Sequence, residues 1–159
     1  VIFGKSNRNV AAIAPMTVVR EIMPDDPELL YRLAKKWLPL SSPARREALN
    51  RADELLNNLS ASDRKLLLIK AEVKYEKQEF DDALIQFQYC LDSNPQDYVT
   101  HYRVANIQWK LGDLETAESK LDYVLRMSDN RSLKLKCEKL LTVIKAEQKK
   151  IRDSADSAN

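Results

Sequence analysis

Glycine is scarce in this chain: it has two glycines in 159 residues, whereas average usage near 7% would give about eleven. β-Sandwiches, barrels and glycine-rich phosphate loops all need residues that tolerate positive φ, so this shortage disfavours them. The residues that dominate instead are leucine, alanine, lysine, glutamate and arginine, which lose little conformational freedom in a helix. The composition therefore predicts an all-α protein of about one domain.

Cysteine and long apolar runs are also scarce. Cys90 and Cys137 are the only cysteines, too few for a disulfide framework or a zinc site. Both fall on apolar helix faces, so we expect free, buried thiols in a reducing compartment. No apolar run approaches the ~20 residues that a membrane-spanning helix needs. We expect a cytoplasmic protein, and a soluble domain of a membrane-anchored protein is the alternative, because residues 1–4 could be the remainder of a removed anchor.

The sequence shows no recognisable pattern of the residues that enzyme catalysis requires. His101 is the only histidine, and we expect it to be packed and not catalytic or metal-binding. The acidic pair Asp81 and Asp82 opens a helix, where carboxylates favour the positive end of the helix dipole. We therefore expect no enzyme activity, no catalytic residue, no metal, no cofactor and no small-molecule substrate.

Charge is unevenly distributed along the chain. Residues 72–122 contain eleven acidic and five basic residues, a net charge of −6, whereas residues 126–152 contain nine basic and three acidic residues, a net of +6. This uneven charge distribution suits an acidic or anionic partner at the basic end of the chain. The alternative is that two solvated helix faces differ in sign without a function.

An internal repeat organises the middle of the chain. Shifting the sequence by 34 residues aligns many like residues, which a chance match does not explain. The aligned pairs are Ala71 with Ala105, Val73 with Ile107, Tyr75 with Trp109, Phe80 with Leu114, Ala83 with Ala117, Phe87 with Leu121, Cys90 with Val124, and Leu91 with Leu125. Each repeat is predicted to form a helix, a short turn and a second helix, over residues 63–95 and 97–129.

Residues that typically begin or end helices support these repeat boundaries. Asp63 is placed to cap the first helix of the first repeat, and Pro95 to end its second helix. Gly112 fits the position after a helix, where positive φ is required.

This pattern resembles the tetratricopeptide-repeat (TPR) family over about residues 63–130. The resemblance rests on a small residue midway along each first helix, on an aromatic-or-leucine, acid, x, alanine opening to each second helix, and on a closing proline. The sequence departs from the family where Leu67 and His101 replace a tryptophan-like anchor and where Asp129 replaces the second proline. The resemblance implies a right-handed superhelical stack of antiparallel helix pairs, a TPR-like α-solenoid.

The flanking segments extend this organisation into one helical domain over residues 28–152. Residues 28–59 are predicted to form a divergent hairpin with a longer turn, and residues 132–152 a terminal capping helix. Residues 1–27 are expected to be irregular or to dock on the domain, and residues 153–159 to form a flexible tail.

The resemblance implies a concave groove lined by the first helices, which would bind a peptide or helix of a partner protein. The residues that it projects onto this groove are Lys65, Leu68, Ile69, Glu72, Val99, Tyr102, Arg103, Asn106, Leu133, Lys136 and Leu140. The alternative is that these side chains pack against a neighbouring helix or the N-terminal segment. Tyr75 and Trp109 are expected to pack between repeats.

We therefore predict a protein-interaction module, an adaptor or scaffold within a larger assembly. One alternative is that the basic helix from Lys134 to Arg152 binds an anionic partner or surface, although it has no aromatic residues with which to stack nucleic-acid bases. Another is a structural subunit whose groove is covered by its own N-terminal segment or by a neighbour. The clamp for acidic C-termini of heat-shock chaperones is disfavoured, because Leu68 and Glu72 do not supply its cationic and amide partners.

Overall fold

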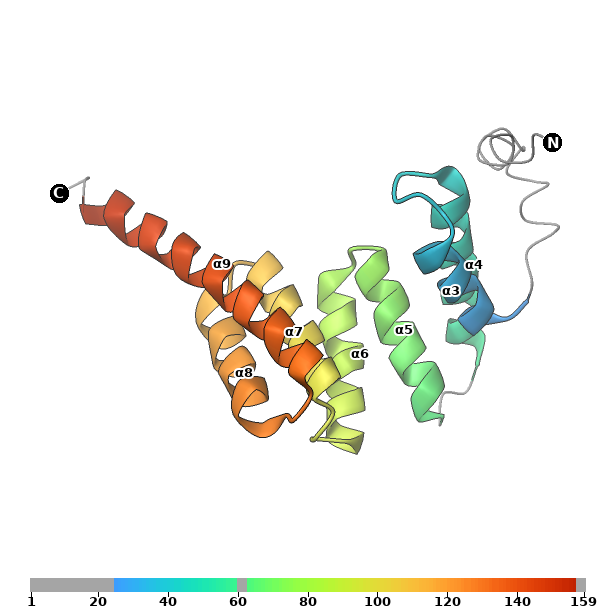
Figure 1. Ribbon diagram of the computed structural model, residues 1–159. Coiled ribbons are helices and arrows are strands. Elements are labelled where there is room, and N and C mark those ends of the chain that lie inside the picture. The colour runs from blue at the N-terminus through green and yellow to red at the C-terminus, as the bar shows by residue number, and fades with distance from the viewer. Residues whose placement is uncertain (1–24, 60–62, 157–159) are drawn as a thin grey trace, which may run out of the picture. The chain divides into compact units, whose positions relative to one another are not determined.

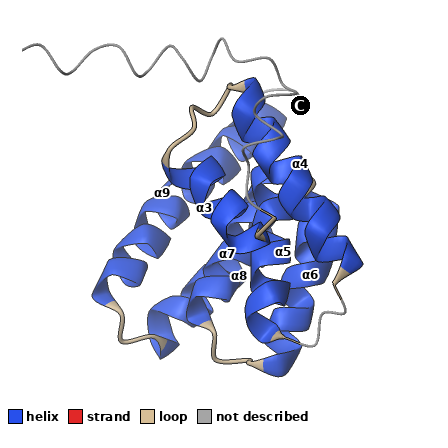
Figure 2. Ribbon diagram, turned by 90° about the vertical axis from the view of Figure 1, so that its right-hand side faces the viewer, coloured by secondary structure: helices blue, strands red, loops and turns tan. Residues whose placement is uncertain are grey.

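The computed structural model describes residues 25–59 and 63–156, and within them every regular element is an α-helix (Figures 1 and 2). The helices are α3 (Pro27–Lys36), α4 (Pro43–Asn58), α5 (Arg64–Glu76), α6 (Phe80–Ser93), α7 (Tyr98–Lys110), α8 (Leu114–Met127) and α9 (Arg131–Asp156). The predicted all-α fold class is confirmed. The expected N-terminal segment lies outside the described residues except for its last three.

Short polar side chains begin most of these helices. Asp63 accepts a hydrogen bond from the Lys65 backbone N–H at 2.9 Å, which confirms the predicted cap of α5. The carboxylates of Asp26, Asp97 and Asp113 and the hydroxyl of Ser42 do the same for α3, α7, α8 and α4. Each cap satisfies one of the backbone N–H groups that a helix start leaves unpaired. These local bonds explain why the helices begin where they do.

The described residues form two compact units, which divide between residues 86 and 87, inside α6. They are called unit 1 and unit 2 in chain order. In unit 1, α3 and α4 form an antiparallel hairpin, and α5 contacts both of them. The core of unit 1 is apolar and comprises Leu30, Ala34, Ala48, Leu49, Ala52, Leu56, Ile69 and Val73. Burying such side chains contributes on the order of 1.5–3 kcal/mol for each large one.

In unit 2, α7 and α8 form the hairpin, and α9 contacts both helices. Its core comprises Ala105, Ala117, Leu121, Val124, Leu133, Cys137, Leu140, Leu141 and Ile144. Cys90 and Cys137 are free and buried, as predicted. Burial in this apolar setting raises the pKa of the Cys137 thiol to about 11, so the thiol is held in its neutral form.

The last helix is longer than the sequence indicated. A flexible tail was expected from Asp153, but α9 continues through Asp156. No glycine or proline interrupts the segment, and the Ser154 hydroxyl donates a hydrogen bond to the Lys150 carbonyl at 2.7 Å. The last turns of α9 extend past the α7/α8 hairpin (Figure 1).

Candidate protein-interaction site

In unit 1, α3 and α5 lie side by side and are joined by polar contacts. Glu28 of α3 forms an ion pair with Lys65 of α5 at 2.6 Å, and Lys35 forms one with Glu72 at 3.4 Å. Both pairs join residues that are 37 positions apart in the sequence, which shows that α3 and α5 run parallel in a constant register. The Tyr31 hydroxyl, on the same face of α3, donates a second hydrogen bond to Glu72 at 2.9 Å.

These contacts bury some of the groove residues predicted on α5. Ile69 is buried in the unit 1 core, and Glu72 is buried beneath Tyr31 and Lys35. Leu68 is half-buried, and Lys65 is exposed but paired with Glu28. The hydrogen bond to Glu28 raises the pKa of the Lys65 amine. For Ile69 and Glu72, therefore, the packing alternative holds.

In unit 2, the groove residues predicted on α7 differ in how far their side chains are exposed. Val99 is 52% exposed, whereas Tyr102, Arg103 and Asn106 are partly buried. Tyr102 packs against the unit 2 core. Burial raises the pKa of its hydroxyl and outweighs the opposing charge of Arg103, and Cys137 of α9 adds to the increase. The side chain of Tyr102 thus connects α7 to α9.

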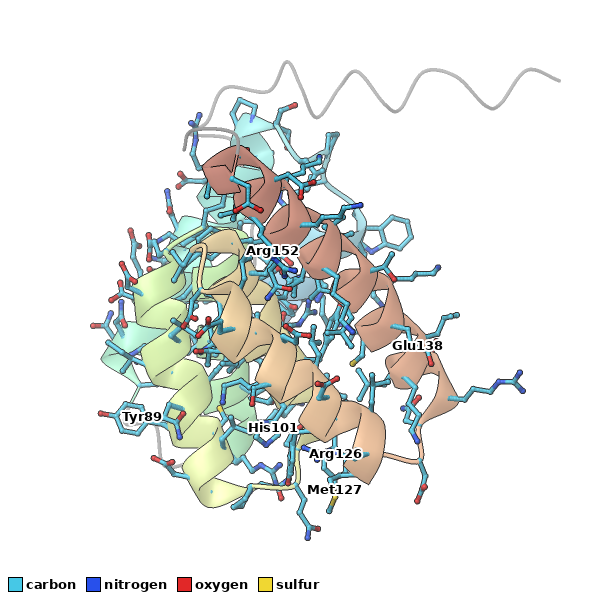
Figure 3. All side chains as sticks on the ribbon, turned by 90° about the vertical axis from the view of Figure 1, so that its left-hand side faces the viewer. Tyr89, His101, Arg126, Met127, Glu138 and Arg152 are labelled. Carbon is cyan, nitrogen blue, oxygen red and sulfur yellow. The ribbon has the colours of Figure 1, made fainter. Side chains whose placement is uncertain are left out.

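The groove residues predicted on α9 lie on different faces of the helix, one exposed and one buried. Lys136 is exposed, but Leu133 and Leu140 are buried in the core and do not line a groove. The apolar stripe of α9 packs against α8, and a residue on that stripe cannot also face a partner. Leu135 and Val143, which no feature of the sequence pattern singles out, are 52% and 42% exposed. Figure 3 shows Glu138 and Arg152 near opposite ends of this helix.

Tyr75 and Trp109 were expected to pack between repeats. The ring contact of Tyr75 is made within its own repeat, whereas Trp109 contacts α9, which follows the second repeat. Tyr75 and Phe80 stack with ring centroids 6.0 Å apart and planes tilted by 59°. The indole Nε1–H of Trp109 donates a hydrogen bond to Glu147 of α9 at 2.9 Å, and the Lys110 ammonium lies 5.6 Å from the centroid of the Trp109 ring. Trp109 therefore fixes the end of α7 to α9.

A buried charge cluster in unit 1 was not predicted. Asp53 of α4 accepts hydrogen bonds from Lys74 at 2.8 Å and Lys77 at 2.6 Å, and both ammonium groups also pair with Glu79. Burial would raise the pKa of the Asp53 carboxyl, but the two lysine hydrogen bonds outweigh it and lower the pKa. The same balance lowers the pKa of Glu79. The cluster therefore stays ionised and ties α4 to the turn between α5 and α6.

Arg45 is a second buried charged residue that the sequence did not reveal. Its guanidinium donates a hydrogen bond to the carbonyl of Ala34 at 2.6 Å and forms an ion pair with Glu76. Arg45 thereby satisfies a carbonyl at the C-terminal end of α3 and connects α3 and α4 to α5. No spacing signal identifies such a residue, because its partners are distant in the sequence.

His101 has a packing role in unit 2, as expected. Its Nε2 lies 2.9 Å from the carbonyl oxygen of Pro95, and its ring meets the Tyr123 ring edge-on at 5.0 Å. Among the residues that the structure describes, no group of three or more histidine, cysteine or acidic side chains could hold a metal ion. Of the described helices, none is long and apolar enough to cross a membrane.

Comparison with solved structures shows the fold. The Yersinia enterocolitica type III secretion chaperone SycD, in complex with a peptide of the translocator YopD, matches with a TM-score of 0.59 and 20% identity, over 80% of this chain and 98% of that one. SycD alone matches with a TM-score of 0.60 and 19% identity, over 84% and 93%. PcrH in complex with the chaperone binding region of PopD matches with a TM-score of 0.58 and 17% identity, over 76% and 92%.

Sequence comparison gives the family. No curated protein matches the chain significantly. The family model described as the TT21 fifth ARM repeats domain matches residues 64–156. This segment comprises α5 to α9, which include both repeats and the long last helix. Because the match covers more than half of the sequence, the chain belongs to the family of the TT21 fifth ARM repeats domain.

Proposed function

We propose that the chain is a TPR-type protein-interaction module that binds a peptide or helix of a partner protein. In this proposal residues 28–152 act as one TPR-like domain, and α9 caps its helical array. The binding face is the one that α7 and α9 form in unit 2. It is defined by Val99, Tyr102, Arg103, Asn106 and Lys136, together with the exposed Leu135.

The observation that carries the proposal is the exposure of Val99 on the same face of α7 as the partly buried Tyr102 and Arg103. Val99 of α7 and Leu135 of α9 are each 52% exposed, and Val143 and Ile151 of α9 are exposed as well. Tyr102 is held in place by the unit 2 core, so it would lose little conformational freedom on binding. Tyrosine and arginine are also enriched among residues that dominate interface energetics.

The structural neighbours support the same class of function. SycD and PcrH, which share the fold, have been solved with a translocator peptide and with the chaperone binding region of PopD. A helical array of this kind can therefore hold a segment of another protein. The partner of the present chain does not follow from this likeness, because the identities are 20% and 17%.

The test is a peptide-display selection on the intact protein, followed by measurement of the selected peptide's affinity for variants. Val99→Asp with Arg103→Glu should weaken binding about tenfold or more, because the changes remove an apolar contact and reverse a charge on the proposed face. Tyr102→Phe is preferable to Tyr102→Ala, since truncating Tyr102 would also remove packing against the core. Circular dichroism should show unchanged helicity in each variant.

A matched set of lysine variants tests the basic helix as the alternative site. Lys145→Gln, Lys149→Gln and Lys150→Gln remove positive charge from exposed positions of α9. We expect these changes to have little effect at moderate salt, where exposed charges are screened. If binding is lost through the lysines and kept in the Val99/Arg103 variant, the α7/α9 face is not the site.

A further inference from the structure

The loop that joins α3 to α4, residues 37–42, exposes two large apolar side chains. Trp37 is 81% exposed and Leu40 is 85% exposed, more than any other large apolar residue that the structure describes. The loop backbone is nevertheless anchored, because the Trp37 N–H donates to the Leu33 carbonyl and the Ser42 N–H to the Pro39 carbonyl, each at 3.0 Å. The loop backbone, which follows α3 in unit 1 (Figure 1), therefore has a defined conformation.

A pocket of about 420 Å³ lies beside this loop, between α4 and the turn that follows α5. Leu40 and Leu49 supply apolar wall, and Arg46, Asn50 and Gln78 supply polar groups. Leu40 belongs to both the loop and the pocket, so the pocket borders the loop at this residue. Six of the eight residues that line the pocket are polar or charged, so the pocket itself suits a polar or charged group, and the exposed Leu40 at its edge suits an apolar one.

Some of the cationic side chains at this pocket form ion pairs or hydrogen bonds within the chain, and one does not. Arg45 is engaged by Ala34 and Glu76, and the Lys77 ammonium lies 2.6 Å from Asp53 and 2.9 Å from Glu79. Arg46 is exposed, and its side chain has no hydrogen bond or ion pair within the described part of the chain. The pocket thus offers one guanidinium whose donors are available to a carboxylate.

We propose that Trp37, Leu40 and Arg46 form a second docking site, which binds a short segment of a partner protein that carries a carboxylate next to a large apolar side chain. The apolar side chain packs on Trp37 and Leu40, and the carboxylate pairs with Arg46 at the pocket. The charge of Arg46 selects an acidic segment over a basic one. The site lies wholly within unit 1, so it does not depend on the α7/α9 face.

The first experiment uses two synthetic peptides with the same Trp-Leu centre, one flanked by aspartates and the other by lysines. They are titrated into the full-length protein while the two indole N–H signals, of Trp37 and Trp109, are followed by NMR. The acidic peptide should shift the Trp37 signal and leave that of Trp109, which is bonded to Glu147, in place. Its affinity should exceed that of the lysine peptide by about three- to tenfold.

The second experiment reverses the charge in the protein. Arg46→Glu should weaken the acidic peptide about tenfold and strengthen the lysine peptide, and Trp37→Ser with Leu40→Ser should weaken both peptides about tenfold or more. Arg32→Glu with Ile85→Ser is the matched control, because Arg32 is an exposed arginine of α3 and Ile85 is 53% exposed on α6. The control should bind both peptides as the unmodified protein does.

Three outcomes would overturn the proposal. In the first, the acidic and basic peptides bind equally and Arg46→Glu changes neither. In the second, the Trp37 signal is already protected from a soluble paramagnetic probe without peptide, which would mean that the chain covers its own surface. In the third, the Trp37 signal moves with protein concentration alone, which would assign the surface to a second copy of the chain.

Discussion

Gln78 and Gly112 lie 34 residues apart, one repeat period, and both have a left-handed backbone, with φ of +64° and +86°. The hydrogen bonds around them correspond. The Gln78 N–H donates to Tyr75 and the Gly112 N–H to Trp109, each at 3.0 Å. The two repeats thus share one turn geometry, which confirms the position predicted for Gly112, while the first repeat adopts it with a residue that carries a Cβ.

This relationship predicts opposite effects of two substitutions. A non-glycine residue at positive φ costs about 1–2 kcal/mol, partly offset because glycine makes the unfolded chain more flexible by about 0.4–1 kcal/mol. Gln78→Gly should therefore raise the free energy of unfolding by about 0.5–1 kcal/mol. Gly112→Ala should lower it by a similar amount through strain alone, since an added Cβ meets nothing within 4 Å. Urea denaturation measures both, and a destabilised Gln78→Gly would contradict the strain argument.

Ala105 is fully buried in the core of unit 2, and Ala71 is fully buried at the equivalent position of the preceding repeat. Ala105→Leu should overpack the contact between helices and cost about 1–3 kcal/mol. Ala146→Leu on the exposed side of α9 is the control and should change the melting temperature little. Thermal denaturation followed by circular dichroism gives the comparison. An unchanged melting temperature for Ala105→Leu would show that the site has room that the structure does not indicate.

The repeat spacing made the helices and most of the core predictable, because Ala71, Ala105 and their neighbours recur with a fixed period. The surface was less predictable. Leu133 was placed in the groove, but it belongs to the same apolar stripe as Cys137 and Leu140, and that stripe packs into the core. Arg45 and Asp53 escaped prediction because their burial depends on ion pairs with α5 and the turn after it, which no local pattern encodes.

The Asp53 cluster should contribute measurably to the stability of unit 1. Asp53→Asn removes the charge that Lys74 and Lys77 share, although both ammonium groups keep Glu79 as a partner. We expect a loss of about 2 kcal/mol in the free energy of unfolding. Asp122→Asn, at an exposed position of α8, serves as the control and should have a much smaller effect. Equal losses in the two variants would mean that the buried cluster contributes nothing specific.

The same cluster predicts a pH dependence with a defined sign. The folded pKa values of Asp53 and Glu79 lie below their ordinary values of 3.8 and 4.5. Their contribution to stability is therefore fully present above pH 4.5 and is lost as the pH falls through the lower folded values. The free energy of unfolding should decrease with acid in this window, and less steeply in Asp53→Asn. Parallel acid curves for the two proteins would contradict the assignment.

The last prediction concerns α9, whose buried residues complete the core of unit 2. Leu133, Cys137, Leu140, Leu141 and Ile144 pack with Leu121 and Val124 of α8. Removing residues 132–159 would expose this apolar surface to water, and helical arrays need a polar outer face at their ends to remain soluble. We expect that truncation to aggregate, as measured by light scattering during refolding. Removing residues 152–159 retains every buried residue of α9 and should leave a soluble protein. If the longer truncation stays monomeric and unfolds cooperatively, α9 is an accessory helix and not the cap of the array, because its apolar stripe would then be dispensable for the core.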